Sequence, residues 1–187
     1  MKVLMIFADG FEDVEAIATR DVLVRAGIEV IDSRINNDDE VVSSHHMHLN
    51  NFIPLNKVSL VGVDAVIIPG GSRGVNNLLK SDLVDHIIKT AYLADKYVCA
   101  ICAGPMVLAK NGLLKERRFT CYPGCEDGLD GIYTGEEVVV DHKIITARSM
   151  YYSVLFGLTI IEALLGKTVR DKIYKQIAGI KEDCLLH

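Results

Sequence analysis

Three short, almost uninterrupted apolar runs are the feature of this sequence that most restricts its fold. They cover residues 3–7, 64–68 and 97–101, and each is followed by a turn and then by a segment with helical periodicity. A strand that is apolar on both faces must be covered on both faces, which is typical of the parallel sheet of an α/β protein. We therefore predict a mostly parallel sheet between two layers of helices.

The rest of the chain extends this alternating pattern. The segments with helical periodicity are 14–26, 73–80, 82–95, 105–111, 150–165 and 167–178. The further segments expected to form strands are 28–31, 118–121, 136–140 and 143–147. Residues 41–49 alternate weakly between apolar and polar, which favours a hairpin at a sheet edge.

Length, charge and cysteine content narrow the class of protein. A chain of 187 residues suits one domain, spanning 1–187, with a sizeable core. Its net charge of −5 and its scattered basic residues disfavour a nucleic-acid partner. The apolar stretch 151–165 is too short and too polar to cross a membrane, and the N-terminal run is too short for a signal peptide. An odd count of five cysteines favours free thiols in a reducing cytoplasm.

Cys102 lies where the apolar run 97–101 meets the helical pattern that begins at Pro105. A sharp strand-to-helix turn lifts the side chain at the joint out of the sheet and aims the free N–H groups of the helix at it. Those groups and the helix dipole lower the pKa of a thiol. The alternative is a buried structural cysteine, but this setting favours a reactive nucleophile.

Two other loops, 8–13 and 69–72, are expected at the same end of the sheet, where ligands bind in such folds. Glu15, in the first turn after the first loop, either complements the helix dipole or points at Cys102 as a partly buried carboxyl with a raised pKa. Gly70 and Gly71 either form a plain turn or present N–H groups to an oxyanion.

Four segments in order, 8–15, 66–71, 100–105 and 160–167, resemble the ThiJ/PfpI (DJ/PfpI) superfamily. They are most similar to its branch of small dimeric proteins that includes the parkinsonism-associated deglycase. The resemblance implies a flavodoxin-like three-layer α/β/α sandwich, and a homodimer without a cofactor. It also implies that Cys102 is the nucleophile of an elbow and that Glu15 is a carboxylic acid hydrogen-bonded to its thiolate. The N–H groups of Gly71 and Ala103 would form an anion site.

The chain departs from the family pattern at three positions near the expected pocket. Tyr122 occupies a position where many relatives carry histidine, and a tyrosine with its pKa near 10 is a poor base. Arg148 is followed by Ser-Met-Tyr-Tyr in place of a Gly-Pro-Gly turn, which would reshape the pocket. His45 stands near a position often held by arginine, and in a family-type dimer it would partly replace the missing histidine of the partner's site.

The remaining histidines and cysteines have plainer interpretations. His46 and His48 share one face of a strand at a spacing that suits a metal, but without a visible third ligand we expect a solvated hairpin and no metal. Cys99 and Cys102 have a thioredoxin-like spacing, but strand alternation would place them on opposite sides.

Three further cysteines lie outside that strand. Cys121 and Cys125 flank a loop near the expected pocket, so either is a candidate to resolve a sulfenic acid on Cys102. The alternative for both is a buried structural thiol. Cys184 falls in a C-terminal tail that we expect to be mobile.

Two classes of function follow. The first is a glyoxalase- or deglycase-type lyase or hydrolase, in which Cys102 attacks a small reactive carbonyl or a glycated protein side chain and Glu15 moves protons. The second is a redox sensor, oxidative-stress protein or chaperone that uses an oxidisable Cys102 without turnover. A peptidase or amidase is weaker because its histidine is missing. A role in thiazole-phosphate synthesis, the label of some relatives, lacks a phosphate loop.

Overall fold

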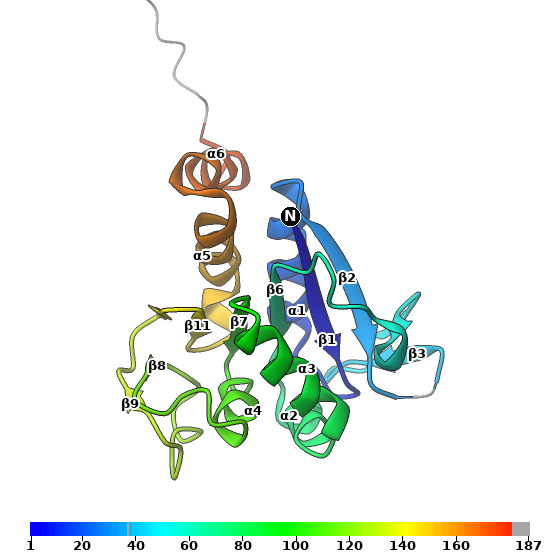
Figure 1. The fold of residues 1–187 in the computed structure, drawn as a ribbon. Helices are drawn as coiled ribbons and strands as arrows, with labels where there is room; N and C mark the ends of the chain where they lie inside the picture. The colour runs from blue at the N-terminus through cyan, green and yellow to red at the C-terminus, as the bar shows by residue number, and fades with distance from the viewer. Residues whose placement is uncertain (37, 181–187) are drawn as a thin grey trace, which may run out of the picture.

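The structure is a computed structural model that describes residues 1–36 and 38–180. Its centre is a seven-stranded sheet with the strand order β10-β11-β7-β6-β1-β2-β5 (Figure 1). The strands of this sheet are β1 Lys2–Phe7, β2 Glu29–Arg34, β5 Ile53–Pro54, β6 Ala65–Ile68, β7 Tyr97–Ile101, β10 Val138–Asp141 and β11 Ile144–Ala147. All neighbours are parallel except β10 and β11, which form an antiparallel edge. The mostly parallel sheet expected from the apolar runs is confirmed.

Helices cover both faces of this sheet. The helices are α1 Asp13–Arg25, α2 Ser72–Leu78, α3 Asp82–Leu93, α4 Pro105–Lys110, α5 Ser153–Leu165 and α6 Lys167–Ile177. One hydrophobic cluster joins the sheet to α2, α3 and α4, and a second joins it to α1, α5 and α6. Figure 1 shows α3 in front of the strands and α1 behind them. The arrangement is the flavodoxin-like three-layer sandwich that the motifs predicted.

The apolar character of the strands has a direct structural cause. In β1, Leu4 and Ile6 enter the cluster under α2 to α4, whereas Val3 and Met5 enter the cluster under α1, α5 and α6. All four side chains are fully buried. Because successive side chains of a strand point to opposite faces, a strand covered on both sides must be apolar at every position.

Two predicted strand segments lie outside the central sheet. Residues 41–49 do form a hairpin, with strands β3 Glu40–Val42 and β4 His48–Asn50, but these two strands make a sheet of their own. The hairpin is tied to the loop after β1, since the Gly10 N–H donates to the Val42 carbonyl at 2.7 Å. The expected strand at 118–121 shortens to β8 Arg118–Phe119, which pairs with β9 Ile132–Tyr133. The prediction of an edge hairpin in the main sheet was therefore wrong in its placement.

The strand order places three loops together. After β1 the chain adds β2 and β5 on one side of it and then β6 and β7 on the other, so the order switches between β1 and β6. The carboxyl ends of β1, β6 and β7 lie at the same end of the sheet. In open α/β sheets this is where ligands bind.

Within the described ranges, no helix combines the length and the apolar character needed to cross a membrane. The cytoplasmic location and the homodimer stay predictions. Cys184 lies outside the described residues.

Candidate active site

Cys102 follows β7 directly, and its backbone is fixed from two sides. Its N–H donates to the carbonyl of Ala147 at 2.9 Å, and its own carbonyl accepts from the N–H of Tyr122 at 2.9 Å. The φ angle of Cys102 is +62°, in the left-handed region that a residue with a Cβ rarely adopts. Such a conformation costs about 1–2 kcal/mol, so the surrounding hydrogen bonds must impose it. This is the geometry expected of a nucleophile elbow.

The strain at Cys102 can be measured with two substitutions. We expect Cys102→Gly to be more stable than Cys102→Ala by about 1 kcal/mol, because glycine adopts a positive φ without steric cost. At an ordinary strand or helix position the order is reversed. Urea unfolding of both variants checks this, and an alanine variant at least as stable as the glycine variant would contradict a strained elbow.

Glu15, the predicted acid, is a buried carboxyl group beside Cys102. Its side chain comes from the first turn of α1 and is only 1% exposed. Its Oε2 accepts a hydrogen bond from the Gly70 N–H at 2.8 Å, whereas its buried Oε1 has no hydrogen-bond partner among the described residues. Burial raises the pKa of Glu15 to about 7; contact with the Cys102 thiol opposes this rise, and the nearby charge of Glu12 adds to it. At neutral pH, Glu15 therefore exchanges a proton readily.

Gly70 brings the acid and the thiol together. A Cβ built on Gly70 would lie 2.4 Å from Glu15 Oε2 and 2.8 Å from the Cβ of Cys102. Both side chains therefore pack against the bare Cα of this glycine, and neither would fit against a larger residue. The sequence pointed to Gly70 as a source of N–H groups for an anion, but its N–H is already used by Glu15. That expectation needs correction: Gly70 holds the acid and leaves space for the thiol.

Gly71 and Ala103 are the other two residues predicted for the anion site. The Ala103 N–H hydrogen-bonds the Cys102 sulfur and lowers its pKa. Gly71 has a φ of +93°, and a Cβ there would come within 2.4 Å of the Gly10 carbonyl oxygen. Only glycine therefore fits where the loop after β6 touches the loop after β1, a contact that the sequence pattern did not indicate.

The ionisation of Cys102 differs from the sequence-based expectation. Burial and the carboxylate of Glu15 raise the pKa of the Cys102 thiol above its usual range, while the Ala103 N–H opposes this. The helix that was expected to lower the pKa, α4, has only six residues. Because two adjacent negative charges are unfavourable, ionisation of Glu15 and ionisation of Cys102 oppose each other, and Glu15, which has the lower pKa, ionises first.

Tyr122 and Arg148 belong to the two segments that are hydrogen-bonded to the backbone of Cys102: Tyr122 makes one of these bonds, and Arg148 follows Ala147, which makes the other. The Tyr122 N–H bonds to Cys102, but its side chain is 52% exposed. The guanidinium of Arg148 donates to the Gly135 carbonyl at 2.9 Å and to the Tyr152 hydroxyl, and lies over the ring of Tyr152. Arg148 is therefore held in part by Tyr152, one of the four residues that follow it.

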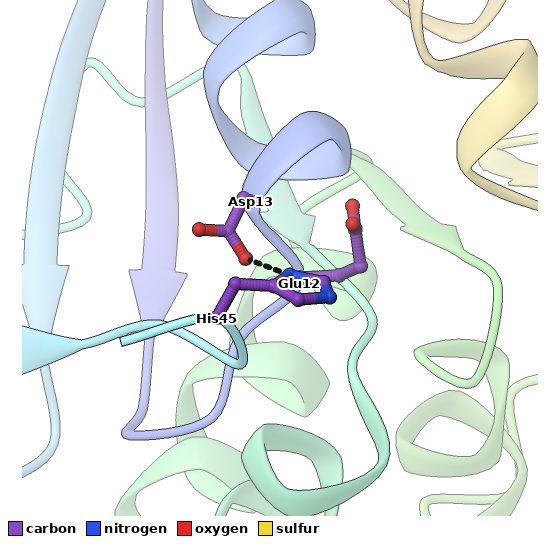
Figure 2. Close-up of side chains that lie close together, drawn as sticks. All are labelled: Glu12, Asp13 and His45. Carbon is purple, nitrogen blue, oxygen red and sulfur yellow. Dashed lines mark hydrogen bonds and ion pairs between the residues drawn. The ribbon is translucent and has the colours of Figure 1, made fainter. Parts of the chain in front are cut away.

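His45 contacts the start of α1. Its Nδ1 lies 2.8 Å from an Asp13 carboxylate oxygen, while the carboxylate of Glu12 points away from the pair (Figure 2). Partial burial raises the pKa of Asp13, but hydrogen bonds from Ser43 and His45 outweigh it and bring the value down to about 2. Potential ligand atoms of Glu12, Asp13 and His45 lie within 4.8 Å of one another. However, Asp13 and His45 are bonded to each other, and Glu12 accepts from the Glu15 N–H at the helix start, whose positive dipole end disfavours a cation.

His46 and His48, the two predicted candidates for metal ligands in this hairpin, lie in different surroundings. His46 lies in the turn with a φ of +64°, and His48 pairs with Glu40 at 3.1 Å. The strand alternation that would have placed both histidines on one face therefore does not extend through the turn.

The described cysteines, Cys99, Cys102, Cys121 and Cys125, are all free thiols. Cys99 is fully buried, and both Cys99 and Cys102 pack against the cluster under α1, α5 and α6. The expectation that they face opposite sides was wrong, because the positive φ at Cys102 ends the strand alternation. Cys121 is fully buried and Cys125 is half-buried.

Comparison with known proteins adds to this geometry. Residues 1–163 match the model of the DJ-1/PfpI family. The chain is 34% identical over 175 residues to protein dj-1beta of Drosophila melanogaster, covering 92% of this chain and 94% of that protein. It is 30% identical over 173 residues to the glutathione-independent glyoxalase DJR-1.2 of Caenorhabditis elegans, covering 91% of each. The crystal structure of Drosophila melanogaster DJ-1beta has a TM-score of 0.91 at 33% identity, covering 95% of this chain and 97% of that chain.

Proposed function

The chain belongs to the DJ-1/PfpI family, and we propose that within it the chain is a cysteine-dependent enzyme that acts on small reactive carbonyls. One observation carries the proposal: a buried glutamic acid with a pKa of about 7 packs beside a cysteine held in a strained turn. A relative that is 30% identical is named a glyoxalase, which supports this substrate class. Glycated protein side chains, in which the former aldehyde carbon is a carbinol carbon bonded to the side chain, are the second substrate that we propose.

The first chemical step makes a carbon–sulfur bond. The Cys102 thiol gives its proton to the Glu15 carboxylate as its sulfur bonds to the aldehyde carbon of an α-oxoaldehyde. The carbonyl electron pair moves to oxygen, which then receives that proton from Glu15. The product is a hemithioacetal. The N–H groups of Ala103 and Gly71 are the donors that we assign to the developing oxyanion, since the N–H of Gly70 is occupied by Glu15.

The later steps return every group to its starting state. Glu15, now a carboxylate, removes the proton from the former aldehyde carbon, and a proton is delivered to the neighbouring carbon. This internal redox step yields a thioester of a hydroxy acid. Water then hydrolyses the thioester, which releases the hydroxy acid and restores the Cys102 thiol. No external oxidant or reductant is needed.

Methylglyoxal tests the proposal directly. We expect the purified protein to convert it to lactate and Cys102→Ala to lose this conversion completely, because the sulfur forms the covalent bond. The matched control is Cys125→Ser, which changes a half-buried thiol outside the acid–thiol pair and should keep its activity. A Cys102→Ala protein that retains turnover would overturn the proposal. A glycated peptide in place of methylglyoxal distinguishes the deglycase activity from the glyoxalase activity.

A redox role without turnover is the second candidate function, and Tyr122 favours it. Among the described residues the structure ties Tyr122 to Cys102 through the backbone alone, with the phenol half exposed. Glu15 is then the sole titratable side chain that we assign to proton transfer. Selective peroxide oxidation of Cys102 in a protein that does not turn over methylglyoxal would support this second function.

A further inference from the structure

A turn that carries a second thiol is attached to the backbone of Cys102. Tyr122 donates its N–H to the Cys102 carbonyl at 2.9 Å, and Cys125 donates its N–H to the Tyr122 carbonyl at 2.9 Å. Cys125 is thus two backbone hydrogen bonds away from the nucleophile, although it follows Cys102 in the chain by a whole helix and a strand. The thiol of Cys125 is near enough for its charge to raise the pKa of Cys102.

Cys121, in the same segment, is a poor reaction partner for Cys102. Its side chain is fully buried, and its sulfur lies 3.9 Å from an oxygen of Glu126. Burial and the charge of Glu126 raise the pKa of the Cys121 thiol to about 12, which suppresses its thiolate. Burial and the charge of Glu126 raise the pKa of the Cys125 thiol as well, but Cys125 is only half-buried and its sulfur does not bond to Glu126 among the described residues. Of the two, Cys125 is therefore the thiol that solvent and a neighbouring sulfur can reach.

The backbone beside Cys125 has room to move. Gly124 has a φ of +91°, and a Cβ built on it would meet nothing within 4 Å. The segment between β8 and β9 contains turns but no helix or strand. A disulfide requires this turn to shift so that the Cys125 sulfur approaches Cys102, and the shift must loosen the packing of Cys125 against the hydrophobic cluster under α2 to α4.

From this arrangement we propose that Cys125 is the resolving thiol of Cys102, so that peroxide converts the pair into a reversible disulfide. The Cys102 thiol attacks one oxygen of hydrogen peroxide, which gives a sulfenic acid and releases water. The sulfur of Cys125 then attacks the sulfenic sulfur, the S–O bond breaks, and a second water leaves with the Cys125 proton. The two thiols lose two electrons in total, and peroxide receives them.

The disulfide would protect the nucleophile. Oxidation beyond sulfenic acid is irreversible for most proteins, whereas a disulfide is reopened by a thiol reductant. This role requires a peroxide-reactive Cys102 but no turnover of carbonyls, so it extends beyond the proposed enzyme activity.

Peptide mapping of the full-length protein tests the proposal. The protein is treated with equimolar hydrogen peroxide, its free thiols are blocked, and trypsin releases residues 97–110 and 119–143 as separate peptides. We expect these two peptides to be linked in the sample that receives no reductant. After reduction they should be separate. Fragmentation spectra assign the bond, because Cys99 shares the first peptide with Cys102, and Cys121 shares the second with Cys125.

Matched variants decide which thiol resolves. Cys125→Ser should lose the linked peptide and accumulate sulfinic acid on Cys102, and Cys125→Ala should do the same. Cys121→Ser should keep the link. A link through Cys121, or sulfinic acid on Cys102 in the wild-type protein without any link, would overturn the proposal. Methylglyoxal turnover of the reduced protein is measured in the same batch: turnover without the link rejects this role alone, and the link without turnover rejects the proposed enzyme alone.

Discussion

Replacement of Glu15 by glutamine is expected to lower methylglyoxal turnover by about 10²- to 10⁴-fold, the usual contribution of a positioned acid–base group. Glutamine keeps an oxygen that can accept from the Gly70 N–H but cannot transfer a proton. The fold and the position of Cys102 should therefore be retained while proton transfer is lost. Initial rates at saturating substrate, with Glu137→Gln as an exposed control, measure the effect.

The same substitution is expected to stabilise the protein above about pH 7. The pKa of Glu15 is about 7 in the folded state against 4.5 for the ordinary side chain, so the folded state binds more protons between these values. The free energy of unfolding then falls as the pH rises from 4.5 to 7, by roughly 3 kcal/mol in total. Glutamine removes this dependence. Urea unfolding at both ends of the pH range should show a variant that is more stable than the wild-type protein only at high pH. Equal stability of the two proteins at high pH would contradict a buried Glu15 with a raised pKa.

Gly70→Ala is expected to damage both stability and activity. The new methyl group would lie 2.4 Å from Glu15 Oε2 and 2.8 Å from the Cβ of Cys102, so one of these side chains must move. Overpacking of this kind costs about 1–3 kcal/mol. The displaced pair should also lose most of its turnover, because catalysis is sensitive to shifts of about 1 Å.

Gly112→Ala is the matched control for this substitution. Gly112 has a φ of +73°, but a Cβ there would meet nothing within 4 Å. Its alanine variant should lose about 1 kcal/mol through backbone strain alone and keep its turnover. If Gly70→Ala is likewise destabilised but fully active, the close packing of Glu15 and Cys102 around Gly70 is not needed for catalysis.

The sequence predicted the framework because the framework depends on local patterns. The apolar runs that became β1, β6 and β7 indicate burial on both faces, and the carboxyl ends of parallel strands meet at one end of a sheet. That rule placed the start of the helix that carries Glu15 at the same end of the sheet as Cys102, whereas contact between the two side chains was one of two interpretations of Glu15.

What the sequence could not predict depends on atoms from distant segments. The raised pKa of the Cys102 thiol comes from burial and from Glu15, and the role of Gly70 depends on side chains from two other loops. The hairpin of β3 and β4 has a strand-like pattern in either sheet, and its position is set by backbone hydrogen bonds to the loop after β1. These contacts leave no periodic signal in the sequence.

The two backbone hydrogen bonds that hold Cys102 also determine when this residue acquires its strained conformation. One partner is Tyr122 and the other is Ala147, so the strained turn needs segments that are synthesised well after Cys102 itself. A chain that has emerged only as far as Cys102 has neither partner, and its cysteine is free to relax into an ordinary conformation. Cys102 therefore reaches its positive φ only after β11, which ends at Ala147, has been synthesised and has paired with β7.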